Sequence, residues 1–256
     1  SCKTEDNIQP QRIKLSDRNW KVQSSKKVTV SGNEISTREV DINQWYNAFV
    51  PSTIMGILTQ NGLYKDILNG LNYKDIDRTP FDHSWWYRKE FDLPLLTSNQ
   101  HALLYFDGLS YSANVWLNGT KIASREEFYG PFRQFSFDIT PHLAENNTLA
   151  VEVFRAQPGD FNIGFIDWNP RPADESMGIF REIYIDITDK VEMKHPYVHS
   201  KINLGTMDEA WLTVETTLKN HSGKKVKGNL MGQYEDREFT FPVTLEAGEE
   251  KTVTLT

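Results

Sequence analysis

From Trp85 to its last residue, the sequence is a series of short apolar-alternating runs, and this pattern restricts the fold more than any other feature. The runs are rich in β-branched and aromatic residues and end at turn signals. Asn118-Gly119 is the strongest of these signals, because both central residues of a type I′ hairpin turn need a positive φ. Short strands at this spacing, with almost no helix, predict an all-β sandwich of the jelly-roll type. The expected strands of this first series are 85–93, 101–106, 112–117, 121–124, 132–139, 148–154 and 178–187.

The part of the chain before Trp85 is less regular. Trp20 and Val22 fall on the same face of an expected strand. Ser52 followed by Ile54, Ile57 and Leu58 at helical spacing predicts one short helix that ends near Asn61-Gly62.

Residues 63–82 predict a long irregular connection, and such connections are usually functional or cover another part of the fold. Its Tyr64 and Tyr73 have two interpretations. Either they line a ligand cleft, or they pack the connection onto the body of the domain.

A second series of runs begins after Thr188 and predicts an immunoglobulin-like sandwich. Only 256 − 189 = 67 residues follow position 189, whereas such a domain needs about 100. We therefore expect this sandwich to be truncated. The predicted organisation is a linker over residues 1–15, a jelly-roll domain over 16–189 and the truncated sandwich over 190–256.

The charge balance excludes one class of partner. Lys and Arg number 28 and Asp and Glu number 35, so the net charge is 28 − 35 = −7. An acidic chain without a basic run is a poor binder of phosphate backbones, so no nucleic acid is expected. No apolar stretch approaches the ~20 residues of a membrane-spanning helix.

Cys2 is the single cysteine, so no intrachain disulfide can form. The polar run that follows it is typical of the mature end of a bacterial lipoprotein. This interpretation predicts lipidation of Cys2 and a location in the periplasm or at the cell surface, where only the lipid anchor reaches the membrane. The alternative is an ordinary exposed cysteine.

The stretch from residue 166 to 172 predicts a stiff loop, because Pro170 and Pro172 remove backbone donors and hold their neighbours extended. Within it, Trp168 stands between Asp167 and Asn169. An indole beside hydrogen-bonding groups suits a sugar, whose C–H faces pack on aromatic rings while its hydroxyls need polar partners. The alternative is that Trp168 fills the core and Asp167 forms a turn.

Several motifs, in the right order, resemble glycoside hydrolase family 2, which includes β-galactosidases, β-glucuronidases, β-mannosidases and exo-β-glucosaminidases. Residues 177–183 resemble its GI-aromatic-R signature, and residues 85–91 resemble its WYR-x-x-F strand. The runs within 106–119 resemble its F-x-G-V and V-x-L-N-G pair. Residues 167–170 and 50–66 are most similar to the β-mannosidase and exo-β-glucosaminidase branch. The resemblance covers most of the chain from about residue 20.

The resemblance implies a retaining mechanism with two glutamates on a (β/α)₈ barrel. No alternating strand and helix pattern occurs in this sequence, so the barrel is expected to be a missing C-terminal part of the same protein. Adjacent acids such as Glu126-Glu127 and Asp174-Glu175 point to opposite faces of an extended chain and do not converge on one bond. We expect no catalytic residue in this chain.

The resemblance also implies that Asp167, Trp168 and Asn169 contact the terminal sugar of the substrate. Asp167 would accept hydrogen bonds from sugar hydroxyls or hold the ammonium group of glucosamine, and Trp168 would form a wall of the −1 subsite. Asp174 is a further candidate for substrate contact, with an acid confined to its own loop as the alternative.

The expected function is that of the non-catalytic N-terminal part of a retaining exo-β-glycosidase, of the β-mannosidase, exo-β-glucosaminidase or β-galactosidase type. Two alternatives are a free-standing carbohydrate-binding module without hydrolytic activity and a surface module without a ligand. No cofactor is expected. No metal is expected either, because the histidines are scattered and Pro196 interrupts the spacing of His195 and His199.

Overall fold

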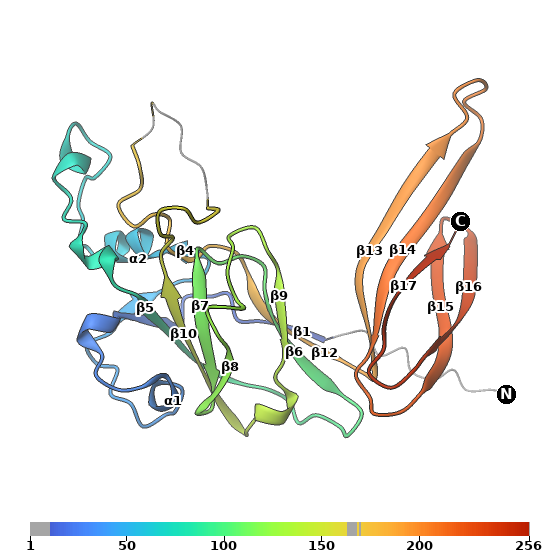
Figure 1. Ribbon diagram of the computed structural model, residues 1–256, viewed down its shortest axis with the longest axis horizontal. Helices are drawn as coiled ribbons and strands as arrows, with labels where there is room; N and C mark the ends of the chain where they lie inside the picture. Colours follow the sequence, from blue (N-terminus) through green and yellow to red (C-terminus); the bar gives the residue numbers. More distant parts are fainter. Residues whose placement is uncertain (1–10, 163–167, 169, 256) are drawn as a thin grey trace. The chain divides into compact units, whose positions relative to one another are not determined.

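Two antiparallel sheets carry the first part of the chain (Figure 1). The computed structural model describes residues 11–162, 168 and 170–255. The prediction of an all-β sandwich is confirmed. One sheet has six strands in the order β3 (Tyr46–Ala48), β2 (Trp20–Ser24), β5 (Trp85–Asp92), β10 (Asn146–Phe154), β7 (Ser112–Leu117) and β8 (Thr120–Ala123). The other has four strands in the order β1 (Gln11–Lys14), β12 (Ile183–Thr188), β6 (His101–Phe106) and β9 (Phe135–Asp138).

The core of the six-stranded sheet follows from the alternation in its central strand, β10. Val151 pairs with Tyr87 on β5 and with Val115 on β7, and all three side chains are fully buried. Because side chains in register on adjacent strands share a face, the three form one layer of the core. Trp20 lies edge-on to Tyr87, with ring centroids 6.3 Å apart, and extends this layer onto β2.

The predicted linker is too long at its end, because Gln11–Lys14 forms β1. Ile13 pairs with Ile185 on β12, and the Arg12 guanidinium binds the Asp186 carboxylate through two hydrogen bonds of 2.8 Å. Asp186 lies 174 positions from Arg12, so nothing in the polar sequence of residues 11–14 points to this pairing.

The predicted strand 178–187 is wrong as a single element. It forms two strands, β11 (Gly178–Ile179) and β12, which belong to different sheets. β11 pairs with the short strand β4 (Ser52–Thr53), whereas β12 joins the four-stranded sheet. The chain passes from one sheet to another between them, and the continuous alternation of residue types in this run gives no sign of it.

The predicted short helix is confirmed as α2 (Ile54–Gln60), with its end marked by Gly62 at a φ of 79°. Its N-cap is Thr53 and not Ser52, because the Thr53 hydroxyl accepts a hydrogen bond from the Gly56 N–H at 3.3 Å. The remaining helical elements are α1 (Gly32–Ile35) and the 3₁₀ turns η1 (Ser25–Lys27), η2 (Asn72–Asp75), η3 (Thr79–Asp82) and η4 (Thr140–His142).

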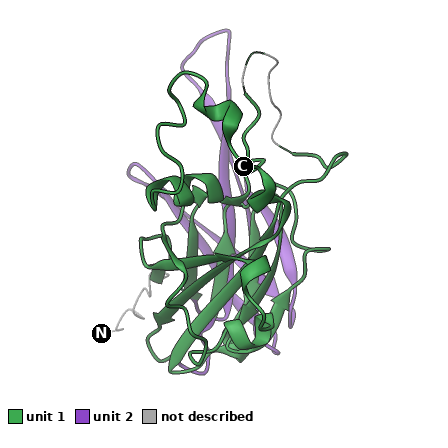
Figure 2. Ribbon diagram, turned by 90° about the vertical axis from the view of Figure 1, so that its left-hand side faces the viewer, with its two compact units in different colours: residues 1–95, 102–187 green, residues 96–101, 188–256 purple. Residues whose placement is uncertain are grey.

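The chain divides into two compact units (Figure 2). The first runs up to Leu95 and continues over Ala102–Ile187, and the second combines Leu96–His101 with Thr188–Thr256. The second unit has a three-stranded sheet in the order β13 (Val191–Ile202), β14 (Ala210–Asn220) and β17 (Glu250–Leu255), and a hairpin of β15 (Val226–Tyr234) and β16 (Arg237–Leu245).

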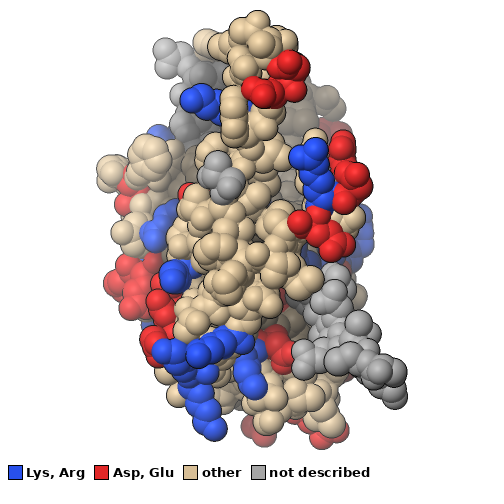
Figure 3. All heavy atoms as spheres, turned by 90° about the vertical axis from the view of Figure 1, so that its right-hand side faces the viewer, with Lys and Arg blue, Asp and Glu red and all other residues tan. Residues whose placement is uncertain are grey.

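The second unit has a small core, which is formed by Leu218, Leu245 and Val253. Many of its other apolar side chains are exposed, among them Tyr197, Trp211 and Phe241. Figure 3 shows a continuous uncharged area on one face of the molecule, with charged side chains along its margins. None of the helices among the described residues is long and apolar enough to cross a membrane.

Candidate functional site

The loop predicted to contact sugar is described at Trp168, whereas Asp167 and Asn169 lie outside the described residues. The Trp168 side chain is 81% exposed. The alternative interpretation, in which Trp168 fills the core, is therefore wrong. An exposed indole leaves its ring face free for the C–H face of a sugar.

Asp174 lies in a different setting from the one predicted for a substrate contact. Its side chain is 2% exposed, and its carboxylate accepts hydrogen bonds from the Met55 N–H at 2.8 Å and the Ser176 N–H at 3.0 Å. Met55 is in the first turn of α2, where unpaired N–H groups favour a negative charge. Asp174 thus fastens the segment after the loop to α2, and its contact with substrate stays a prediction.

The segment between the loop and β11 is a tight turn. Glu175 and Ser176 both have positive φ, at 53° and 57°, and the Met177 N–H donates to the Asp174 carbonyl at 2.8 Å. The Arg171 guanidinium binds the Glu175 carboxylate at 2.8 Å. These contacts fix the turn, so the C-terminal end of the loop is anchored.

Gly178 completes this anchor at the point where the turn enters β11. Its φ is 148°, and a Cβ there would lie 2.6 Å from the Ser52 carbonyl oxygen and 2.7 Å from the Thr53 Cα. The Ile54 N–H also donates to the Met177 carbonyl at 2.8 Å. Because the approach is backbone to backbone, only glycine fits at this position.

The connection over residues 63–82 meets the loop directly. The Tyr73 hydroxyl donates a hydrogen bond to the Arg171 carbonyl. Tyr64 stacks on the buried ring of Phe81, with centroids 6.2 Å apart. Tyr64 therefore packs against another residue of the same connection, and Tyr73 links the connection to the loop.

Burial raises the pKa of Asp174, although hydrogen bonds from Met55, Thr53 and Ser176 act in the opposite direction. A carboxyl group with a raised pKa in the folded state stabilises the fold fully below its ordinary pKa, and this contribution is lost as the pH rises through the folded pKa.

We expect the stability difference between the natural protein and Asp174→Asn to be largest in acid and to shrink as the pH rises. Asparagine does not titrate, and its NH₂ group faces a backbone donor, so the variant should also be less stable by roughly 1–3 kcal/mol. Denaturant unfolding of both proteins from about pH 3 to pH 7 measures the difference. A difference that grows with pH would contradict the raised pKa.

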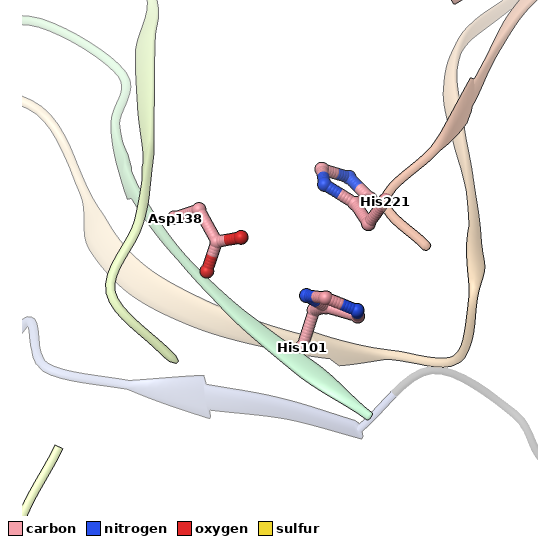
Figure 4. A group of neighbouring side chains, drawn as sticks. All are labelled: His101, Asp138 and His221. Carbon is pink, nitrogen blue, oxygen red and sulfur yellow. The ribbon is translucent and has the colours of Figure 1, made fainter. Parts of the chain in front are cut away.

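Figure 4 shows three further side chains that sequence reasoning did not single out: His101, Asp138 and His221. His101 and His221 belong to the second unit, with ring centroids 5.2 Å apart, and the His221 Nε2 lies 2.7 Å from the Glu192 carboxylate. Asp138 is on β9 of the first unit. We assign no metal site to residues of two different units.

Comparisons with known proteins place these features in context. The family described as "Glycosyl hydrolase 2 galactose-binding domain-like" matches residues 20–159. An exo-β-D-glucosaminidase from Amycolatopsis orientalis is 32% identical over 235 residues, which cover 91% of this chain and 22% of the relative. An exo-β-D-glucosaminidase from Arthroderma benhamiae is 29% identical over 245 residues, which cover 91% of this chain and 28% of the relative.

Solved structures of glycoside hydrolases also resemble this chain. The crystal structure of the Amycolatopsis orientalis exo-chitosanase CsxA has a TM-score of 0.88 at 29% identity, over 95% of this chain and 28% of that chain. A Bacteroides uniformis β-glucuronidase has a TM-score of 0.67 at 20% identity, over 96% of this chain and 27% of that chain, and shares the fold. The chain thus spans about a quarter of the length of the relatives that it matches.

Proposed function

Because the chain belongs to glycoside hydrolase family 2, we propose that it is the non-catalytic N-terminal part of an exo-acting β-glycosidase that releases terminal glucosamine. The similarity to exo-β-D-glucosaminidases over 91% of the chain is the observation that carries this proposal. Hydrolysis with retention needs two carboxyl groups about 5–5.5 Å apart across the scissile bond. In this proposal both belong to a barrel outside the present chain.

The proposed role of this chain is to form one wall of the substrate pocket. Trp168 packs against the terminal sugar ring, Asp167 binds its ammonium or hydroxyl groups, and Asn169 donates to a hydroxyl. The exposed indole of Trp168 supports this role, as does the anchor that Asp174 and Gly178 give the loop.

The proposal extends to the location of the protein. Cys2, which lies outside the described residues, would carry a lipid that anchors the enzyme in the periplasm or at the cell surface of a bacterium. The sequence around Cys2 supports this part of the proposal. Mass spectrometry of the N-terminal peptide from the native host tests it, because an unmodified Cys2 would exclude the anchor.

The full-length protein should hydrolyse nitrophenyl β-D-glucosaminide faster than the corresponding mannoside, galactoside or glucuronide. The ammonium group at C2 distinguishes the first of these substrates and gives Asp167 its charged partner. Kinetics on the four substrates measure the preference, and NMR of the first-formed anomer measures retention. A preference for the mannoside would reject glucosamine as the substrate. Sugar binding without any hydrolysis would favour the carbohydrate-binding module instead.

A further inference from the structure

A recess lies in the first unit, and none of its lining residues belongs to the loop or the turn described above. Its volume is about 200 Å³, a size that suits one sugar ring better than an oligosaccharide. Four segments line it: the end of β2 with η1, the strand β3, the residues after α2, and the residues that lead into β5.

The floor of the recess is aromatic. Tyr46, Tyr64 and Trp85 line it, and Tyr64 is held by its stacking on Phe81. The Trp85 indole N–H donates to the Pro80 carbonyl at 3.0 Å, so this ring has a satisfied donor and a fixed orientation. Aromatic rings fixed in this way suit the C–H face of a sugar.

The rim of the recess is basic, although the chain as a whole is acidic. Lys26, Lys27 and His83 line it, and all three side chains are exposed. Burial, and to a smaller extent the nearby Asp77 carboxylate, raise the pKa of Tyr64. The Asp77 carboxylate accepts hydrogen bonds from the Thr79 N–H at 2.9 Å and the Thr79 hydroxyl at 3.0 Å. These hydrogen bonds lower the pKa of Asp77 and keep it anionic, but Asp77 does not line the recess. Among the lining side chains, Lys26 and Lys27 carry the ammonium groups that a ligand would meet at the rim.

The walls are formed before any ligand binds. Ser24 pairs with Trp85 in the β2–β5 ladder, and the Ser25 N–H donates to the Ser84 carbonyl at 2.9 Å. The buried Gln23 amide donates to the Gln44 carbonyl at 2.7 Å. These bonds hold the lysines of η1 beside the aromatic floor, which lowers the cost of ordering the site on binding.

We propose that this recess binds a sugar ring that carries an anionic group, either a carboxylate or a sulfate. The ring lies on Tyr46 and Tyr64, and the anionic group contacts Lys26 and Lys27 at the rim. The inference stands on these residues alone, so it does not depend on the proposed hydrolysis of glucosaminides.

Isothermal titration of the full-length protein with glucuronate, glucose 6-sulfate and glucose tests the proposal, because the three probes differ only at C6. At least one anionic probe should bind about tenfold more tightly than glucose, since it adds contacts with two ammonium groups. Tyr64→Ala should weaken binding of that probe about tenfold, and Tyr64→Phe should keep most of it because the ring remains.

The double variant Lys26→Ala with Lys27→Ala should remove the preference for the anionic probe. Lys65→Ala is the matched control, because Lys65 is exposed next to Tyr64 but does not line the recess. Equal binding of glucose and both anions would overturn the proposal. So would anion binding that persists in Tyr64→Ala but disappears in Trp168→Ala, because the sugar would then occupy the loop site.

Discussion

Replacing Trp168 by alanine in the full-length protein is expected to lower kcat/KM for nitrophenyl β-D-glucosaminide by about a hundredfold. The side chain is 81% exposed, so its removal leaves no cavity in the first unit and should not change the unfolding midpoint. What is lost is the aromatic face against which the terminal sugar is proposed to pack. Trp168→Phe should recover part of the activity, since a smaller ring still offers such a face.

Phe161→Ala is the matched control for this experiment. Phe161 is 85% exposed, and it is an aromatic residue of the same part of the chain. Its removal should change kcat/KM less than threefold, which is about 0.6 kcal/mol. If Trp168→Ala and Phe161→Ala had equally small effects, the proposed wall of the pocket would be wrong.

Replacing Gly178 by alanine is expected to destabilise the first unit by about 3 kcal/mol, from backbone strain and from overpacking together. The new methyl group would lie 2.6 Å from a backbone oxygen and 2.7 Å from a Cα, and neither atom can rotate away. For a unit of this size, the thermal midpoint should fall by roughly 6–12 °C. Differential scanning calorimetry of the full-length protein measures the shift.

Gly159→Ala separates the two causes. Gly159 also has a positive φ, at 99°, but no atom lies within 4 Å of a Cβ built there. This variant therefore has the backbone strain without the steric clash, and its free energy of unfolding should fall by only about 1 kcal/mol. Equal shifts for the two variants would show that the close approach of β11 to β4 has no special importance.

Alternation and turn chemistry predicted most strands of both units. The Asn118-Gly119 turn has φ values of 50° and 83°, as the hairpin signal required. The bounds of β6 and β7 coincide with the predicted runs 101–106 and 112–117. These elements are set by local residue order, which is why sequence alone identifies them.

The elements that were missed depend on partners far along the chain. β1 is defined by its pairing with β12, and the break between β11 and β12 depends on the contact of Gly178 with β4. α1 is an exception, because its capping box of Ser31 and Glu34 is a local signal that could have been read from the sequence.

The sequence did not decide where the Trp168 side chain lies. It left open a sugar contact and a place in the core, and only the structure shows that the side chain is exposed. The burial of Asp174 did not follow from its surroundings, because the Met55 N–H that it binds lies 119 positions away. An acid near a loop looks the same in sequence whether it meets solvent or a helix terminus.

The hydrogen bond from Tyr73 to the Arg171 carbonyl makes the connection over residues 63–82 a support for the loop beside it. A library built to alter which sugars an enzyme of this kind accepts would normally randomise only the side chains that touch the ligand. In the proposed pocket, substitutions around Tyr73 would shift the loop while its proposed sugar contacts, Asp167, Trp168 and Asn169, stay unchanged. Directed evolution would thus have a second route to altered specificity.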